Sequence, residues 1–490
     1  GLIGNATSST TPGMPLTLTG CYNTSDITAH NIVAGIVANN AQNKNTVVIT
    51  DCYNRGNITS ATDKSTSSAP TAGITAFFTA GSQIKGCRNY GKITAAKNVF
   101  AGGIVGSYKG TGAKTTPSLV FNCHNEGEIS ADGNQGAGIM GISMAYTTID
   151  SCSNVASVSG GFGMAGILAN ISGEGLVISR CWNEGNIDGA NRYVGGIGGW
   201  GNVEGTITEC FNIGNITSHS DIQGSGTTAG FGIGGIAGYA GSHITRCYNT
   251  GAVTGATRVG GIVGSTFKNR TKLAECYNTG KVTAPEGMGS ALVGTAVTEE
   301  ADWNTGNTAD NCFFLTDSVA DPRGKALTLK ELAALDMGER WIAGDDYTLP
   351  IIAALNVDAA RLWAACVMLE GDDTFEHVTG NFNVGAPEGL VWTASEPVLS
   401  FQGTRAVFSD EAYKGPLMLT AAIGDRKRTF TLTADKPSGV EGIDADNSQV
   451  TAEEWYTTDG IRIDAPAAKG IYIVVRHYAD GSKKSAKVIQ

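Results

Sequence analysis

Charged residues are scarce in this 490-residue chain, since lysine, arginine, aspartate and glutamate together make up 16%, against about 25% in an average globular protein. The 34 basic residues are outnumbered by 45 acidic ones, so the net charge is −11. This disfavours nucleic acid and anionic membranes as partners, because both require a concentrated positive surface. The 12 prolines follow no Gly-X-Y period, which excludes collagen. No uninterrupted apolar run of about 18 residues occurs, so we expect no transmembrane segment.

Glycine and hydrophobic residues are abundant instead. The chain has 68 glycines and 41% hydrophobic residues, a composition typical of many short strands and turns and too apolar for a disordered chain. At about 150 residues per domain, the length favours roughly three domains.

Cysteine marks an internal repeat. Ten of the eleven cysteines recur at intervals of 29 to 37 residues: they are Cys21, Cys52, Cys87, Cys123, Cys152, Cys181, Cys210, Cys247, Cys276 and Cys312. A period of this size indicates stacked units, each of which is too small to bury its apolar face alone.

Each unit contains two patterned segments. In the first, an asparagine follows the cysteine by two residues and an isoleucine or valine follows it by six, in nine units. These three positions share one parity, so in a strand they point to the same side. An apolar residue three positions before the cysteine breaks the parity, which predicts a bend. The second segment reads Gly/Ala-Gly-Ile in eight units and has glycine or alanine two residues after the isoleucine, where we infer that a larger side chain is excluded.

These patterns, without a helical period between residues 1 and 300, predict an all-β chain whose residues 1–315 form a right-handed parallel β-helix of about ten coils. In-register stacking turns each inward position into a column. We expect the asparagines to hydrogen-bond backbone amides that the corners leave unpaired. We expect the cysteines to be buried free thiols, because parallel neighbours cannot reach a disulfide dihedral without movement.

The repeat resembles the GLUG-type repeats of large bacterial surface and secreted proteins, many of them from Bacteroidetes, in which Cys-Tyr-Asn-x-Gly-x-Val is followed by Gly-Gly-Ile-Val-Gly. Residues 247–253, 260–264 and 276–282 match this motif most fully, and the resemblance covers residues 1–315. It implies an adhesin-like role at the cell surface and names no ligand. Because the chain begins within a repeat unit, we expect a processed or truncated product.

The remaining residues predict three further parts. Residues 316–356 are expected to cap the last coil, with a helix over 328–337 that begins with a Thr328–Glu331 capping box. Period-two runs such as 362–369 predict an immunoglobulin-like sandwich over residues 357–436. After a linker at 437–447, residues 455–463, 469–475 and 487–489 resemble the last strands of type IX secretion sorting domains, so 437–490 is expected to be a linker and a sorting-like β-module.

The candidate ligand-binding residues are the aromatic side chains that directly follow the cysteines: Tyr22, Tyr53, Trp182, Phe211, Tyr248 and Tyr277. Their parity is opposite to that of the core, so we expect them to face outward. Rings about 4.8 Å apart could form a platform for sugar rings or a groove for a protein. The alternative is that the rings stack on one another and are covered by loops.

Other chemistry has little support in the sequence. The six histidines are scattered and no CxxC pair occurs, so we expect no metal, no cofactor and no catalytic residues. Arg180, Glu209, Arg246 and Glu275 alternate in charge before successive cysteines, as a surface ladder requires. The function expected is that of an extracellular or outer-surface adhesin, monomeric, whose partner is a glycan or a host or extracellular protein. A carbohydrate-active β-helix enzyme, such as a polysaccharide lyase or hydrolase, and a passive structural stalk remain as alternatives.

Overall fold

The computed structural model describes most of the chain. The described residues are 2–5, 15–39, 46–61, 69–96, 99–108, 112–132, 135–143, 145–171, 173–201, 204–219, 232–266, 270–294, 306–345, 348–367, 374–376, 382–383, 390–402, 405–409, 416–423, 426–433, 450–457, 462–464, 471–478 and 483–489. They fall into two compact units, Gly1–Ala364 and Ala365–Gln490.

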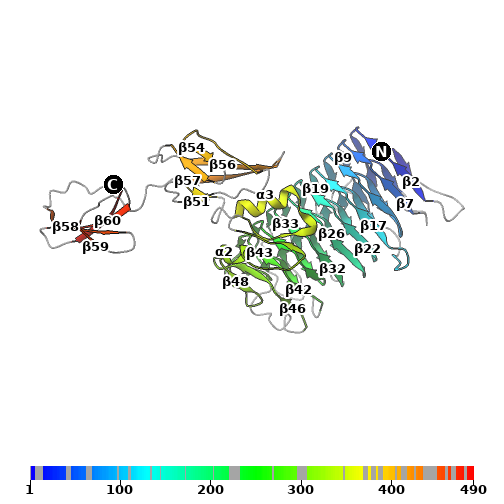
Figure 1. Cartoon of the computed structure of the whole chain (residues 1–490). Coiled ribbons are helices and arrows are strands. Elements are labelled where there is room, and N and C mark those ends of the chain that lie inside the picture. Colours follow the sequence, from blue (N-terminus) through cyan, green and yellow to red (C-terminus); the bar gives the residue numbers. More distant parts are fainter. Residues whose placement is uncertain are drawn as a thin grey trace. The chain divides into compact units, whose positions relative to one another are not determined.

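The first unit is built around a parallel β-helix, as the repeat predicts (Figure 1). Among the described residues its five parallel sheets contain nine, nine, ten, eleven and nine strands. They run from β1 (Ile3–Asn5) to β41 (Val263–Thr266), β5 (Val33–Ala34) to β45 (Gly289–Ser290), β2 (Leu16–Thr19) to β46 (Thr308–Asp310), β3 (Tyr22–Asn23) to β48 (Lys325–Leu327) and β4 (Ile27–Ala29) to β44 (Val282–Thr283).

One coil illustrates the repeat. Its strands are β27 (Leu176–Ser179), β28 (Trp182–Asn183), β29 (Ile187–Gly189), β30 (Val194–Gly195) and β31 (Gly198–Gly201). Neighbouring coils pair in register, so that Asn183 lies between Asn154 and Asn212.

The sheet that carries the asparagines, called here the asparagine sheet, holds the candidate residues. Its strands are β3, β8 (Tyr53–Asn54), β13 (Arg88–Asn89), β18 (His124–Asn125), β23 (Ser153–Asn154), β28, β33 (Phe211–Asn212), β38 (Tyr248–Asn249), β43 (Tyr277–Asn278), β47 (Phe313–Leu315) and β48.

The predicted bend lies directly before each cysteine. The ten residues at this position all have left-handed backbone, with φ between 50° and 64°. Only two of them are glycines, Gly20 and Gly86, although the left-handed conformation costs other residues about 1–2 kcal/mol. The bend therefore follows from the fold and is tolerated by Asp, Asn, Ser, Arg and Glu alike.

The asparagines form a continuous ladder through the interior. From Asn23 to Asn249, each Nδ2 donates to the backbone carbonyl two residues later and to Oδ1 of the next asparagine; for Asn183 the two distances are 2.8 and 2.7 Å. Asn278, the last asparagine, donates only to the carbonyl of Gly280. The prediction of a structural ladder is confirmed, but the expected partner is wrong for most coils. The corner groups that need a partner are carbonyls, so the side chains mainly donate where they were expected to accept.

Glycine makes room for this ladder. A Cβ added at Gly166 would overlap Asn183 and the carbonyl oxygen of Gly196, and the matching glycine of the other Gly/Ala-Gly-Ile segments meets its own asparagine in the same way. The close contact of asparagine and glycine divides the interior into two apolar columns. One contains the cysteines and residues such as Ile178, and the other contains residues such as Ile187 and Val194.

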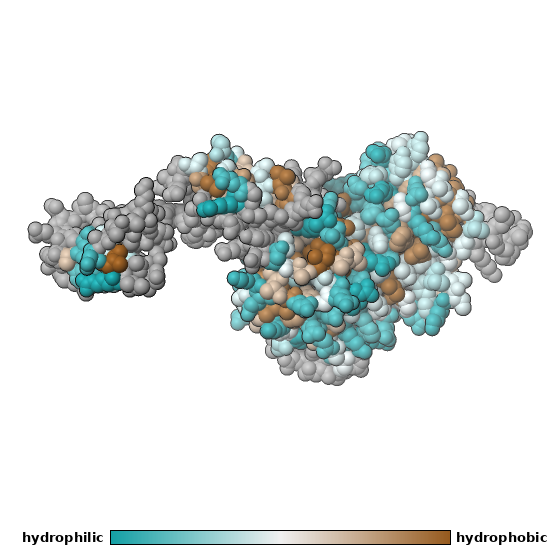
Figure 2. Space-filling view, in the orientation of Figure 1, coloured by the Kyte–Doolittle hydropathy of each residue, from teal (hydrophilic) through white to brown (hydrophobic). Residues whose placement is uncertain are grey.

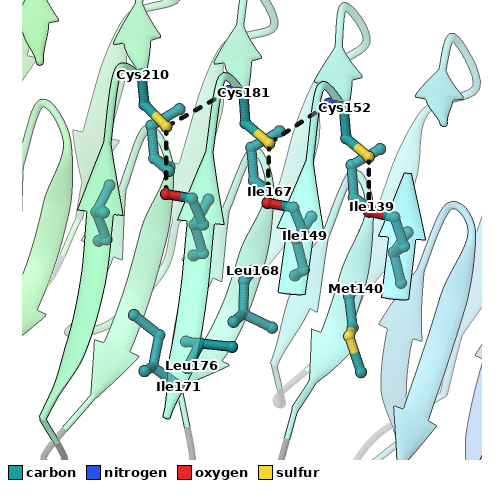
Figure 3. Packing of buried hydrophobic residues seen from close by; sticks show 14 of the residues in the cluster. Ile139, Met140, Ile149, Cys152, Ile167, Leu168, Ile171, Leu176, Cys181 and Cys210 are labelled. Carbon is teal, nitrogen blue, oxygen red and sulfur yellow. Dashed lines mark hydrogen bonds between the residues drawn. The ribbon is translucent and has the colours of Figure 1, made fainter. Parts of the chain in front are cut away.

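The cysteines are packed as free thiols, as predicted. All ten repeat cysteines are unpaired, and nine of them are buried. The thiol of Cys181 donates to the carbonyl of Ile149 at 3.6 Å and accepts from the backbone N–H of Cys152 at 3.4 Å (Figure 3). Burial raises the pKa of the Cys181 thiol well above its usual value, so this side chain stays protonated and keeps its donor.

A buried carboxylate ends the β-helix. In most coils the N–H groups that follow the Gly-Gly-Ile corner donate to a carbonyl of the next coil, as Val263 N does to Leu292 O. In the last coil, Leu292 N and Val293 N donate to Oδ2 of Asp321 at 3.0 and 2.9 Å. Arg323 Nε donates to Asp321 at 2.6 Å and Arg323 Nη2 donates to the carbonyl of Val293 at 2.6 Å. Asp321 thus takes the place of the missing next carbonyl.

The helices after the last coil differ from the prediction. The capping box of Thr328 and Glu331 is present, but α2 (Leu329–Ala333) ends four residues earlier than expected. An antiparallel pair of strands follows, β49 (Trp341–Ile342) with β50 (Ile351–Ile352). It leads through the 3-10 helix η2 (Ala353–Leu355) to α3 (Asp358–Val367). The strand expected at residues 362–369 is therefore wrong for residues 362–367. The run 362–367 is continuously apolar rather than alternating. In the helix, Ala359, Ala360, Leu362, Trp363 and Ala364 are buried.

The second unit begins within α3, because the division falls between Ala364 and Ala365. Its described strands form a four-stranded sheet, β51 (Thr374–Glu376)-β57 (Arg426–Thr433)-β56 (Pro416–Ile423)-β53 (Val391–Ala394), and a three-stranded sheet, β52 (Phe382–Asn383)-β55 (Arg405–Phe408)-β54 (Leu399–Gln402). A third sheet has the order β59 (Arg462–Ile463)-β58 (Val450–Thr457)-β60 (Ile471–Tyr478)-β61 (Lys483–Ile489). The predicted linker at 437–447 lies outside the described residues.

Candidate functional site

The six predicted aromatic residues all lie on the outer face of the asparagine sheet, but they do not share one environment. Tyr22 is 54% exposed, whereas Phe211, Tyr248 and Tyr277 are at most 1% exposed. Tyr53 and Trp182 are half-buried. The column therefore points outward along its whole length, but its C-terminal half is covered and its rings are not accessible.

The closing segment, defined here as residues 338–364, covers that half. Trp341 packs on Tyr248 and Tyr277, with ring centroids 6.1 and 5.7 Å apart. Tyr277 donates its hydroxyl to the carbonyl of Pro350 at 2.7 Å. Arg340 forms an ion pair with the buried carboxylate of Glu209 at 3.5 Å. We expected this segment to seal the end of the last coil, but Trp341 and Pro350 lie over the side of the asparagine sheet.

The charge ladder beside the column is present. Arg246 pairs with Glu209 and with Glu275, both at 3.3 Å, and Arg180 pairs with Asp150. These ion pairs tie adjacent coils together, which supports the structural interpretation of this column.

Two tyrosines buried beneath the closing segment provide a matched test of how this segment packs on the asparagine sheet. Tyr277→Phe removes the hydrogen bond to the buried carbonyl of Pro350, so we expect the free energy of unfolding to fall by about 1–2 kcal/mol. Tyr248→Phe should leave it unchanged or raise it, because the Tyr248 hydroxyl is buried without a partner among the described residues. Urea denaturation of both variants measures the difference, and equal effects would contradict this account.

The aromatic rings stack face to face along the column. Tyr22 and Tyr53 are 5.1 Å apart with an angle of 6° between their planes, and Tyr248 and Tyr277 are 5.0 Å apart with an angle of 5°. Stacked rings cover one another's faces and leave their edges for a ligand. The structure thus combines both expectations, because the rings stack wherever two successive coils carry one at this position and are covered only in the C-terminal half.

What remains open is called here the open strip: the outward side chains of the first six coils of the asparagine sheet. The predicted members Tyr22, Tyr53 and Trp182 lie in it. It also contains Arg88, His124 and the neighbouring column three residues after each cysteine, with Arg55, Tyr90, Glu126 and Glu184. The sequence prediction missed this second column, although its outward parity could have revealed it.

Contacts within the open strip link aromatic and charged groups. The guanidinium of Arg55 lies over the rings of Tyr53 and Tyr90, 5.5 and 4.8 Å from their centroids. Trp182 donates its Nε1–H to Glu184 at 2.8 Å, stacks on Phe211 and meets the ring of His124 edge-on. Such a mixture of Tyr, Trp, Arg and carboxylate suits polar recognition better than apolar packing.

A second aromatic cluster lies on other strands of the β-helix and was not predicted. Tyr193 contacts Phe162, Trp200 and Tyr239, at centroid distances of 5.2, 6.2 and 5.6 Å, and Arg192 lies over Phe162 and Tyr193. Tyr193 and Tyr239 are buried, so the cluster resembles a small external core. Trp200 and Tyr239 both follow Gly-Gly-Ile by three residues, which is the signal in the sequence.

Three further features of the described residues are the hydropathy of their surface, the placement of metal-ligating side chains and the length of their helices. On the face drawn in Figure 2, hydrophilic residues cover much of the described β-helix and the hydrophobic ones form small separate patches. Among the described residues no group of three or more His, Cys, Asp or Glu is placed to hold a metal ion. Within the same residues no helix is long and apolar enough to cross a membrane.

Comparison with known proteins adds no identification: no family model matches the chain, and no curated protein or solved structure matches it either. The geometry of the open strip therefore carries the functional argument.

Proposed function

We propose that the chain is a secreted or cell-surface, adhesin-like protein whose β-helix presents the open strip to a glycan or to a host or extracellular protein. The observation that carries the proposal is the division of one aromatic column. Its C-terminal half is buried beneath the closing segment, while its N-terminal half remains partly exposed, with Tyr22 open and Tyr53 and Trp182 half-buried beside Arg and Glu side chains. Interfaces are enriched in Tyr, Trp and Arg.

The β-helix suits presentation because its coils are tied by backbone ladders, stacked thiols and the asparagine ladder. A rigid scaffold holds ligand-binding side chains in place without an entropic cost at each contact. The resemblance to GLUG-type repeats supports the surface location.

We further propose that the first part of the second unit is an immunoglobulin-like sandwich. Its sheets, β51-β57-β56-β53 and β52-β55-β54, group the second, fourth and fifth strands on one side and the third, sixth and seventh on the other. This is the division of B, E, D from C, F, G in an immunoglobulin domain, and the first strand joins the last in parallel. The final sheet, β58–β61, is proposed as the sorting-like module.

The test is binding of the full chain to a broad array of glycans and extracellular matrix proteins, beside a Tyr22→Ala/Tyr53→Ala/Trp182→Ala variant. We expect a saturable signal that the triple variant weakens at least tenfold, since buried aromatic contacts contribute about 2 kcal/mol or more each at interface hot spots. Phe121→Ala is the matched control, because Phe121 is an exposed aromatic residue of another sheet, in β17 (Ser118–Phe121).

Three outcomes separate the alternatives. A signal that survives in the triple variant would move the ligand site away from the open strip. No binding to any glycan or protein would leave a passive stalk as the better interpretation. Release of cleaved sugar from a bound polysaccharide would instead favour the carbohydrate-active enzyme.

A further inference from the structure

Arg55 occupies the exposed part of the open strip without an acidic partner. Its guanidinium lies 5.5 and 4.8 Å from the ring centroids of Tyr53 and Tyr90, two rings that meet edge-on, and its backbone N–H donates to the carbonyl of Asn23 at 2.8 Å. Within the part of the chain that the structure describes, no ion pair or side-chain hydrogen bond involves the Arg55 guanidinium. The cation is thus held in place by two aromatic rings, and its charge is not neutralised by a neighbour.

Two cations in the next coil, unlike Arg55, have carboxylate partners. Arg88 lies 3.8 Å from a carboxylate oxygen of Glu126, and Lys92 lies 3.0 Å from one of Glu128. Asp26, in the coil before Arg55, accepts a hydrogen bond from the backbone N–H of Asn57 at 2.7 Å. The lack of a partner for Arg55 is therefore not explained by a general lack of carboxylates on this surface.

Stacking determines which groups of Arg55 remain available. The two rings contact the guanidinium through cation–π interactions, which use none of its five N–H groups as partners of an oxygen acceptor. These donors match the two oxygens of a carboxylate or a sulfate in a bidentate arrangement. The stacked rings of Tyr22 and Tyr53 each cover one face of the other, which reduces the ring face that a sugar can contact, so an anionic group would provide the main attraction.

We propose that the open strip binds an acidic glycan, one that carries carboxylate or sulfate groups, and that Arg55 binds one of these groups. The inference rests on the proposed function and specifies its ligand class. Successive coils are about 4.8 Å apart, which is close to the length of one pyranose ring. A polysaccharide along the strip would therefore bring its next charged sugar near Arg88. The Arg88 side chain is 45% exposed, and its nitrogen lies 3.8 Å from a carboxylate oxygen of Glu126, a long distance for an ion pair.

The experiment measures binding of the full chain to immobilised polygalacturonate, heparin and a neutral glucan. We expect binding to at least one of the two acidic polymers, weakened at least about tenfold by Arg55→Ala and partly retained by Arg55→Lys, which keeps the charge but loses the planar fork. Lys272→Ala is the matched control, because it removes an exposed cation of β42 (Lys272–Ala274), outside the open strip. It should change the affinity less than twofold. Circular dichroism shows that each variant is folded.

The outcomes separate this inference from the proposed function. Binding of the neutral glucan, unaffected by Arg55→Ala, would overturn the inference and leave the proposed function standing. Equal losses in Arg55→Ala and Lys272→Ala would also overturn it, because they would indicate non-specific attraction. If no glycan binds while a matrix protein does, the inference fails and the protein ligand of the proposed function remains. If nothing binds, both fail.

Discussion

Replacing Asn183 with aspartate is expected to lower the free energy of unfolding by about 3–5 kcal/mol at neutral pH. The wild-type side chain is fully buried, donates to Gly185 O and Asn212 Oδ1, and accepts from Asn154 Nδ2 at 2.8 Å. A carboxylate has no donor for the first two oxygens, so it would face two acceptors inside the β-helix. Thermal or urea unfolding followed by circular dichroism measures the loss.

The sign of the pH dependence follows from burial. The introduced carboxyl would have its pKa raised in the folded state, since burial and facing oxygens disfavour the charged form. The loss is therefore smallest below the unfolded-state pKa of about 3.9, where the group is neutral in both states. Above it, the loss grows by about 1.4 kcal/mol per pH unit until the folded-state pKa is reached.

Asn186→Asp is the matched control for the same coil. Asn186 is exposed and only accepts, from the backbone N–H of Asn215 at 3.0 Å, and an aspartate can do the same. We expect a change within about 0.5 kcal/mol. If both variants lost stability equally, the ladder would not be the reason that asparagine occupies this position.

Asp321→Ala is expected to reduce the stability of the last coils by about 3–5 kcal/mol, because it removes one partner of a buried ion pair. Asp321 has a fully buried side chain and accepts from Leu292 N, Val293 N, Ser290 Oγ and Arg323. Its removal leaves the N–H groups of Leu292 and Val293 without an acceptor and the guanidinium of Arg323 without its carboxylate partner. Amide hydrogen exchange, followed residue by residue, measures the loss of stability in the last coils.

The exchange experiment has a distinct spatial signature. Faster exchange should appear first in β45 and the coil that contains it, and decrease toward the N-terminal coils, since a solenoid is stabilised by contacts between neighbours. Asp317→Ala removes an exposed carboxylate four residues away and should have no such effect. Uniform destabilisation of all coils, or none, would contradict the role of Asp321 as the terminating acceptor.

The interior of the β-helix could be predicted because its causes repeat. The parity of Cys52, Asn54 and Ile58 recurs in nine units, and each repetition tests the same inference about which side chains point inward. The bend was visible for the same reason, since Ile49 is out of phase with Cys52. The direction of the asparagine hydrogen bonds was not, because it depends on whether carbonyls or amides are left unpaired at the corner.

The candidate site was predicted only in part. Tyr22 and Tyr277 occupy the same position of the repeat, so no local pattern distinguishes the exposed residue from the buried one. The difference comes from Trp341 and Pro350, which lie more than 60 residues beyond Tyr277 in the chain. Likewise, residues 362–367 are all apolar, a run that fits a buried strand as well as a buried helix, but the structure places them in α3 with Trp363 buried.

The sequence by itself determined the coil: its inward columns, its free thiols, its bend and its approximate number of repeats follow from spacing and side-chain size. Only the tertiary structure decided which half of the aromatic column stays open and how the last coil ends at Asp321. It also decided that Arg55 contacts the rings of two tyrosines and has no acidic partner among the described residues. The physical reason is the range of the interactions. Stacking between coils repeats with the sequence period, whereas the closing segment and the terminating carboxylate act once, through contacts that no period records.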